Sequence, residues 1–92
     1  MLQHRKLRIV LDAECGWRKY EVKLFGERTY FVITCDIDEC VRPDAVCDIH
    51  CLPFREKLFD LVLLVEVLEH LENPAKALAK IQRCLRDGGL LI

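Results

Sequence analysis

Short apolar runs recur along this chain and alternate with segments of helical period. Residues 8–12 (RIVLD) form a brief run with β-branched residues, and residues 29–35 (TYFVITC) are strongly β-prone and stop at Asp36. Residues 59–65 (FDLVLLV) are apolar at every position but one, which is typical of a central strand covered on both faces. The pattern therefore predicts three principal strands, with residues 45–47 as a further short strand.

Two segments show the period of an amphipathic helix. In residues 17–25, three aromatic side chains and a leucine recur at helical spacing, and a glycine follows as a stop signal. The second helix is predicted to start after Asn73, a suitable N-cap, with Pro74 at the first helical position. Its apolar stripe consists of Ala77, Leu78, Ile81, Cys84 and Leu85. We expect this helix to end at residues 88–89 (GG) and a last strand to begin at residues 90–92.

The alternation of strands and helices predicts an α/β fold with a mostly parallel sheet and right-handed crossovers. Residues 37–44 contain a proline and no apolar stripe, so a loop or a single turn is expected there. Ligands of such sheets bind beyond the carboxyl ends of the strands. Acids occupy that position four times, at Asp12, Asp36, Asp48 and Glu66. Four acids favour a ligand with hydroxyls, amines or positive charge over ordinary turn chemistry.

The composition is that of one globular domain, residues 1–92. Apolar residues make up 52% and charged residues 32%, and the net charge is −1 with both signs interspersed. Neither nucleic acid nor a membrane surface is therefore indicated as a partner. The longest apolar stretch, residues 61–65, is far too short to span a membrane. We find neither a signal peptide nor a transit peptide at the N-terminus, so a cytoplasmic location is expected.

Six cysteines, at positions 15, 35, 40, 47, 51 and 84, are many for a chain of 92 residues. Without a secretory signal, reduced thiols are the expected state. A zinc site built from Cys40, Cys47, His50 and Cys51 is the alternative. However, the sequence has no C-x-x-C pair, and structural zinc sites usually show paired spacing. Buried or half-buried thiols at strand ends are therefore favoured, and no metal is predicted.

Residues 11–17 (LDAECGW) are nearly the turn that nucleotide-binding folds place after their first strand. A dinucleotide-binding domain needs G-x-G-x-x-G at the start of a helix, so that pyrophosphate meets backbone N–H groups. Here a single glycine, Gly16, stands near the carboxylate of Glu14, and that charge disfavours a phosphate. Dinucleotide binding is therefore the weaker hypothesis.

Together with the segments ITCDID, AVCDIHCLPF and FDLVLLVEVLEHLENPAKALAKIQRCLRDGGLLI, the LDAECGW turn resembles the class I methyltransferases that use S-adenosylmethionine. The resemblance runs in order through nearly the whole chain, and CDIHCLPF and residues 59–89 are its most specific parts. It implies a Rossmann-like, mostly parallel sheet of five strands in the order 3-2-1-4-5. It also implies S-adenosyl-L-methionine as the cofactor and methyl transfer to an unknown acceptor as the function.

The resemblance assigns a role to the ends of the first two strands. The loop under the methionine part of the cofactor would be formed by Asp12, Ala13, Glu14 and Gly16. Asp36 would accept hydrogen bonds from both ribose hydroxyls, which suits an ionised carboxylate because it accepts only and can take two donors.

Further along the chain, the resemblance implies contacts to the adenine and to the reacting methyl group. Ile37 would pack on the adenine ring, and Asp48 would accept a hydrogen bond from its amino group. The backbone N–H of Ile49 would face a ring nitrogen. Val65 and Glu66, after the fourth strand, would lie near the methyl-transfer site.

Methyl transfer needs positioning above all, and a base only if the acceptor must lose a proton. The only acid–base candidates near the expected site are Glu66, Glu69 and His70. For Glu69 and His70, a solvated helix end is the favoured interpretation. His50 is interpreted as a loop residue rather than a catalyst, and Trp17 and Tyr20 as helix packing.

Two departures from the family pattern bear on function. The family loop has glycine where this chain has Glu14, whose Cβ and charge predict weakened cofactor binding. Family members also continue past the fifth strand, so that strand is expected to be an open edge covered by a homodimer partner or another subunit. The alternative to an enzyme is therefore a non-catalytic domain that binds the cofactor or serves as a scaffold.

Overall fold

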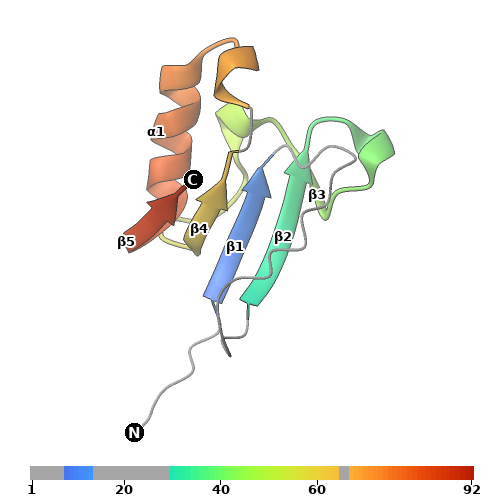
Figure 1. Cartoon of the computed structure of the whole chain (residues 1–92). Helices are drawn as coiled ribbons and strands as arrows, with labels where there is room; N and C mark the ends of the chain where they lie inside the picture. The colour runs from blue at the N-terminus through green and yellow to red at the C-terminus, as the bar shows by residue number, and fades with distance from the viewer. Residues whose placement is uncertain (1–7, 14–29, 65–66) are drawn as a thin grey trace, which may run out of the picture.

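A single parallel sheet organises the described part of the chain, which comprises residues 8–13, 30–64 and 67–92 of a computed structural model (Figure 1). Its strands are β1 (Arg8–Ala13), β2 (Tyr30–Asp36), β3 (Ala45–Val46), β4 (Phe59–Leu63) and β5 (Leu85–Leu91). All neighbouring strands are parallel, in the order β3-β2-β1-β4-β5. This confirms the predicted fold class and strand order. The helix expected over residues 17–25 lies outside the described residues.

One long helix and three short turns complete the described structure. The helix is α1 (Pro74–Cys84), and the turns are η1 (Glu39–Val41), η2 (Ile49–Cys51) and η3 (Leu68–His70). The side chain of Asn73 accepts a hydrogen bond from the backbone N–H of Lys76, which confirms the predicted N-cap. η1 confirms the single turn expected within residues 37–44. No described helix is long and apolar enough to cross a membrane.

The main core lies between α1 and one face of the sheet. Its fully buried members include Leu11, Cys35, Phe59, Val62, Ala77, Ile81 and Cys84. The three α1 members fall on the predicted apolar stripe, and Leu78 and Leu85 pack beside them, partly buried. Phe54 meets Phe59 edge-on, with ring centroids 5.0 Å apart. The helical period of the sequence therefore correctly identified the face of α1 that packs on the sheet.

A smaller apolar cluster occupies the opposite face of the sheet. Val10, Leu61 and Leu63 are buried there, and Val32 packs against them. Val10 pairs with Leu61 and with Val32 across the sheet, so these side chains project on the same side. β4 is therefore buried on both faces, as its continuous apolar sequence predicted.

The end of α1 corrects the prediction that the helix runs to the two glycines. α1 ends at Cys84, and β5 begins at Leu85 rather than at residue 90. The carbonyls of Arg83 and Cys84 accept hydrogen bonds from the backbone N–H groups of Lys57 and Leu58, at 3.0 and 2.8 Å. The segment before β4 thus supplies the donors that satisfy the end of the helix.

The two glycines lie instead within an irregular part of β5. Leu85 pairs with Phe59 and Leu90 pairs with Leu61, so β5 has extra residues between these two partners of β4. Gly88 adopts a positive φ of 79°, which glycine tolerates without a steric penalty. The glycines therefore form a bulge inside the strand and not a helix terminus.

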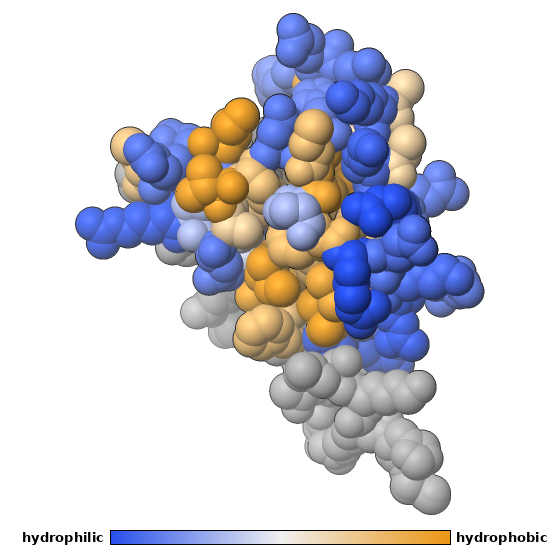
Figure 2. All heavy atoms as spheres, turned by 180° about the vertical axis from the view of Figure 1, so that it is seen from behind, coloured by the Kyte–Doolittle hydropathy of each residue, from blue (hydrophilic) through white to orange (hydrophobic). Residues whose placement is uncertain are grey.

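The face that carries α1 is partly uncovered. Figure 2 shows this face, with an apolar area beside the hydrophilic side chains that border it. Ile9 and Ile33 pack against the main core from this side and remain partly accessible. Phe31, two residues before Ile33 in β2, is 54% exposed. Apolar surface therefore extends from the core toward the amino end of β2.

Candidate functional site

Two buried carboxylates lie together at the carboxyl ends of β1 and β2. Asp12 pairs with Thr34 across the sheet, and Asp36 follows Thr34 by two residues, so both acids project from the same face. The exposed fraction is 2% for Asp12 and 8% for Asp36. The structure thus brings together two of the acids that the sequence placed at strand ends.

One oxygen of the Asp12 carboxylate is buried without a hydrogen-bond donor within the described structure. Its Oδ2 atom is buried and accepts no hydrogen bond from any described residue. Burial, followed by the nearby charge of Asp36, raises the pKa of Asp12 to about 6. A buried carboxylate oxygen without a donor is costly, so this site favours a ligand that brings a cation or a hydrogen-bond donor. Ala13, the next residue, is also buried.

Asp36 is held by the turn that follows β2. Its Oδ1 accepts a hydrogen bond from the backbone N–H of Asp38 at 2.9 Å, and its carbonyl accepts one from the N–H of Cys47 at 3.0 Å. These bonds fix the end of β2 against the end of β3. Ile37, the next residue, is 62% exposed, whereas Asp36 is buried. The residues predicted to contact ribose and adenine are therefore consecutive at the end of β2, one buried and one accessible.

Asp48 lies at the start of η2, after β3. Its Oδ1 accepts hydrogen bonds from the backbone N–H of His50 at 2.9 Å and from the His50 ring at 2.8 Å. These bonds lower the pKa of Asp48, so it is ionised at neutral pH. The side chain of Ile49 is buried in the main core, which leaves only its backbone for the predicted contact to adenine.

Cys47 lies between the two acids that the resemblance assigns to adenosine. Burial raises the pKa of its thiol, a hydrogen bond with Cys35 lowers it, and the charges of Asp48 and Asp36 raise it further. Both carboxylates therefore act on the same thiol at the carboxyl ends of β2 and β3.

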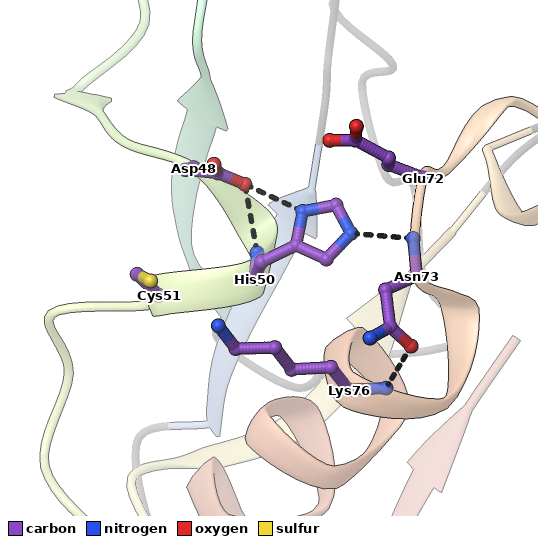
Figure 3. A pocket seen from close by; sticks show the side chains of 6 residues that line it. All are labelled: Asp48, His50, Cys51, Glu72, Asn73 and Lys76. Atoms are coloured by element: carbon purple, nitrogen blue, oxygen red, sulfur yellow. Dashed lines mark hydrogen bonds and ion pairs between the residues drawn. The ribbon is translucent and has the colours of Figure 1, made fainter.

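A polar pocket of about 400 Å³ opens on the α1 side of this edge (Figure 3). Asp48, His50 and Cys51 line it from η2, and Glu72, Asn73 and Lys76 from the start of α1. Sequence reasoning predicted His50 as a loop residue and missed both of its side-chain contacts. The D-x-H spacing of residues 48–50 signals only the bonds to Asp48, because an aspartate at the start of a turn bonds the N–H two residues on.

The remaining predicted site residues are either on the surface or outside the described residues. Glu69 and His70 lie in η3 with largely exposed side chains, 3.6 Å apart between Oε1 and Nε2. Their exposure agrees with the solvated position favoured for them, although they lie in the short turn η3 rather than at the end of a longer helix. Glu14, Gly16, Val65 and Glu66 lie outside the described residues, as do Trp17 and Tyr20.

The five cysteines that the structure describes do not gather into a metal centre, and Cys15 lies outside the described residues. Among these residues, no group of three or more His, Cys, Asp or Glu side chains is placed to hold a metal ion. Both ring nitrogens of His50, a member of the alternative zinc set, are engaged by Asp48 and Asn73. Cys35 and Cys84 are buried, Cys47 is partly buried, and Cys40 and Cys51 are exposed free thiols.

Comparison with known proteins identifies the family. A family model described as a methyltransferase domain matches residues 11–92. An uncharacterized protein of Methanocaldococcus jannaschii is 35% identical over 94 residues, covering 98% of this chain and 41% of its own length. The ubiquinone/menaquinone biosynthesis C-methyltransferase of Bordetella avium is 38% identical over 52 residues, covering 56% of this chain and 20% of its own length.

A further relative, the tRNA (carboxymethyluridine(34)-5-O)-methyltransferase of Arabidopsis thaliana, is 30% identical over 95 residues. The match covers 91% of this chain and 23% of that protein. The chain therefore spans less than half the length of these relatives.

The fold comparison agrees with the sequence comparison. The crystal structure of a proposed S-adenosylmethionine-dependent methyltransferase from Methanococcus maripaludis superposes with a TM-score of 0.76 at 19% identity. That match covers 90% of this chain and 45% of the other. The crystal structure of MccD protein gives the same TM-score at 22% identity, covering 91% and 45%. From its sequence match and its sheet, the chain belongs to the class I S-adenosylmethionine-dependent methyltransferase family.

Proposed function

We propose that this chain binds S-adenosylmethionine at the carboxyl ends of β1, β2 and β3, and that it is the cofactor-binding part of a methyltransferase. The observation that carries the proposal is the pair of buried carboxylates, Asp12 and Asp36, on one face of two adjacent strands. A buried, unsatisfied acid is expensive to keep unless it meets a ligand. S-adenosylmethionine offers what the buried Oδ2 of Asp12 lacks, because it carries hydrogen-bond donors and positive charge.

Each carboxylate suits a different part of this cofactor. Asp36, fixed by the N–H of Asp38, would accept from the ribose hydroxyls. Asp48, ionised at the start of η2, would accept from the adenine amino group. Asp12 would lie toward the methionine part, where an ammonium favours its ionised form. Ile37 would cover the adenine with its exposed side chain.

When bound, S-adenosylmethionine supplies the electrophilic methyl group. The contribution of this chain is to bind and orient the cofactor, since catalysis of an in-line displacement rests mainly on positioning. Glu66 and His70 remain the proposed acid–base candidates for an acceptor that must lose a proton. The Bordetella avium relative is a C-methyltransferase, whereas the Arabidopsis thaliana relative is an O-methyltransferase that acts on tRNA. The segment that this chain shares with both relatives is therefore expected to serve binding of the cofactor rather than recognition of the acceptor, which differs between them.

The alternative is a non-catalytic, methyltransferase-like domain that binds the cofactor or serves only as a scaffold. The sequence observation that favours it is Glu14, which stands where the family loop has glycine. A scaffold that binds nothing has no need for the unsatisfied Oδ2 of Asp12, so that form of the alternative differs from the proposal in whether the site binds a nucleoside.

Isothermal titration with S-adenosylmethionine and S-adenosylhomocysteine separates a domain that binds the cofactor from a scaffold that binds nothing. We expect saturable binding by the wild type, weakened at least about tenfold in Asp36→Ala because two charge-assisted hydrogen bonds are lost. Asp87→Asn is the matched control, because the Asp87 side chain is 91% exposed at the far end of β5. Absence of heat and of any thermal shift at millimolar ligand would leave only the scaffold.

A further inference from the structure

The His50 ring joins the proposed adenine-binding acid to the start of α1. Its Nδ1 lies 2.8 Å from Oδ1 of Asp48, and its Nε2 accepts a hydrogen bond from the backbone N–H of Asn73 at 3.2 Å (Figure 3). The ring is largely buried, with a side-chain exposure of 16%. Both of its nitrogens are thus used, one by η2 and one by the N-cap of α1.

These contacts fix the tautomer of the ring. The backbone N–H of Asn73 can only donate, so Nε2 must present its lone pair. In the neutral imidazole the proton then resides on Nδ1, which donates to the carboxylate of Asp48. His50 is therefore placed as a donor to Asp48 with a defined direction.

The same contacts fix the Asp48 carboxylate. Its Oδ1 receives two donors from His50, the backbone N–H and the ring, so its rotation is restrained. No described residue donates a hydrogen bond to its Oδ2. The side chain is 47% exposed, which leaves it accessible to a ligand. Asp48 is therefore a carboxylate with one oxygen anchored and the other available.

The His50 ring that holds Asp48 is itself bonded to Asn73 at the start of α1, a rigid element. Asn73 caps α1 with its own side chain, and α1 is buried through Ala77, Ile81 and Cys84. A group held by a buried helix keeps its geometry better than a group held by a loop alone. Glu72 and Lys76 also line the pocket, but neither makes a hydrogen bond to the His50 ring among the described residues.

We infer that His50 is a positioning residue that aims Oδ2 of Asp48 at the adenine amino group and sets the selectivity for adenine. This inference rests on the proposed function. An ionised carboxylate accepts from the 6-amino group of adenine, whereas the 6-oxo group of hypoxanthine places an acceptor against it. The better the carboxylate is held, the larger the discrimination between the two bases.

The test compares the dissociation constants of S-adenosylhomocysteine and S-inosylhomocysteine by isothermal titration. The ratio of the two constants isolates the contact at the 6-position of the base. We expect the wild type to prefer the adenine ligand by roughly tenfold or more, and His50→Ala to lose most of that preference. Gln82→Ala, an exposed change on α1, is expected to leave the ratio unchanged.

Two conservative variants separate the two hydrogen bonds of the ring. His50→Asn keeps an amide donor near the position of Nδ1, so it should retain the ratio within about threefold. His50→Gln places an acceptor near the position of Nε2 and can keep only the contact with Asn73. We expect it to behave like His50→Ala in the ratio while unfolding closer to the wild-type temperature.

The outcomes are distinguishable. If His50→Ala weakens both ligands equally, His50 has only a structural role and the inference is overturned. If the wild type binds with dependence on Asp36 but all His50 variants keep the ratio, the inference fails while the proposed function stands. If the wild type binds neither ligand, both fail. Should His50→Ala not fold, the comparison of His50→Asn with His50→Gln decides the question in the same way.

Discussion

At the scale of single residues, Asp12 shows what the sequence could and could not reveal. An acid directly after an apolar run predicted a position at the carboxyl end of a strand, and β1 places it there. Its burial beside Asp36 could not be predicted, because it depends on the pairing of β1 with β2 and on what covers that face. The contact of His50 with Asn73, 23 residues away, was beyond prediction for the same reason.

Replacing Asp12 by asparagine should stabilise the free protein at neutral pH. The folded pKa of Asp12 is about 6, whereas an unfolded aspartate has a pKa of about 3.9. Between these values the unfolded chain releases the proton and the folded protein keeps it, so the free energy of unfolding of the wild type falls as pH rises. We expect Asp12→Asn to gain about 1–3 kcal/mol over the wild type at pH 7.5 and little near pH 4.

Chemical denaturation of both proteins across this pH range measures the difference. Asp87→Asn serves as the control, since its exposed carboxylate should give no such pH-dependent gain. Equal stability of Asp12→Asn and the wild type at pH 7.5 would show that the Asp12 carboxylate is not penalised in the folded protein.

At the scale of elements, periodicity predicted the faces correctly but misplaced one boundary. The apolar stripe of α1 and the continuous apolar sequence of β4 were both confirmed by burial. The helix end was wrong because two glycines are a strong stop signal, whereas tertiary donors from Lys57 and Leu58 end the helix before them. Local signals thus compete with hydrogen bonds from distant segments.

The bulge in β5 makes different demands on its two glycines. Gly88 has a positive φ but open space around it, so Gly88→Ala should cost about 1 kcal/mol and Gly88→Asn less. At Gly89 an added Cβ would lie 2.9 Å from the carbonyl oxygen of Arg86, so the backbone must shift. We expect Gly89→Ala to lower the unfolding temperature more than Gly88→Ala. The reverse order in thermal unfolding would contradict this geometry of the bulge.

At the scale of the whole molecule, the candidate site residues lie at one end of the sheet, where the parallel strands have their carboxyl ends. The carboxyl ends of β1, β2 and β3 carry Asp12, Asp36 and Asp48, while the amino end of β4 carries an ion pair between Asp60 and Arg86. The alternation of strand and helix predicted a mostly parallel sheet, and the family resemblance implied the order of its strands. Which acids are buried and which are exposed needed the structure.

Self-association of the chain stays a prediction. Exposed apolar side chains that would benefit from cover include Phe31 on the α1 side and Leu90 in β5. Sedimentation equilibrium should then show a dimer that Leu90→Ser weakens, with Gln82→Ala as the exposed control. A monomer at all concentrations up to about 100 μM would contradict a homodimer of useful affinity.

The central claim is that an adenosyl ligand binds over the carboxyl ends of β1, β2 and β3. Amide chemical-shift mapping by NMR during titration with S-adenosylhomocysteine tests it most directly. The account predicts the largest saturable shifts at Ala13, Asp36, Ile37 and Asp48, with little change at Lys57 and Asp87 at the opposite end of the sheet. Saturable shifts confined to residues away from these strand ends, or no shifts at millimolar ligand, would contradict it.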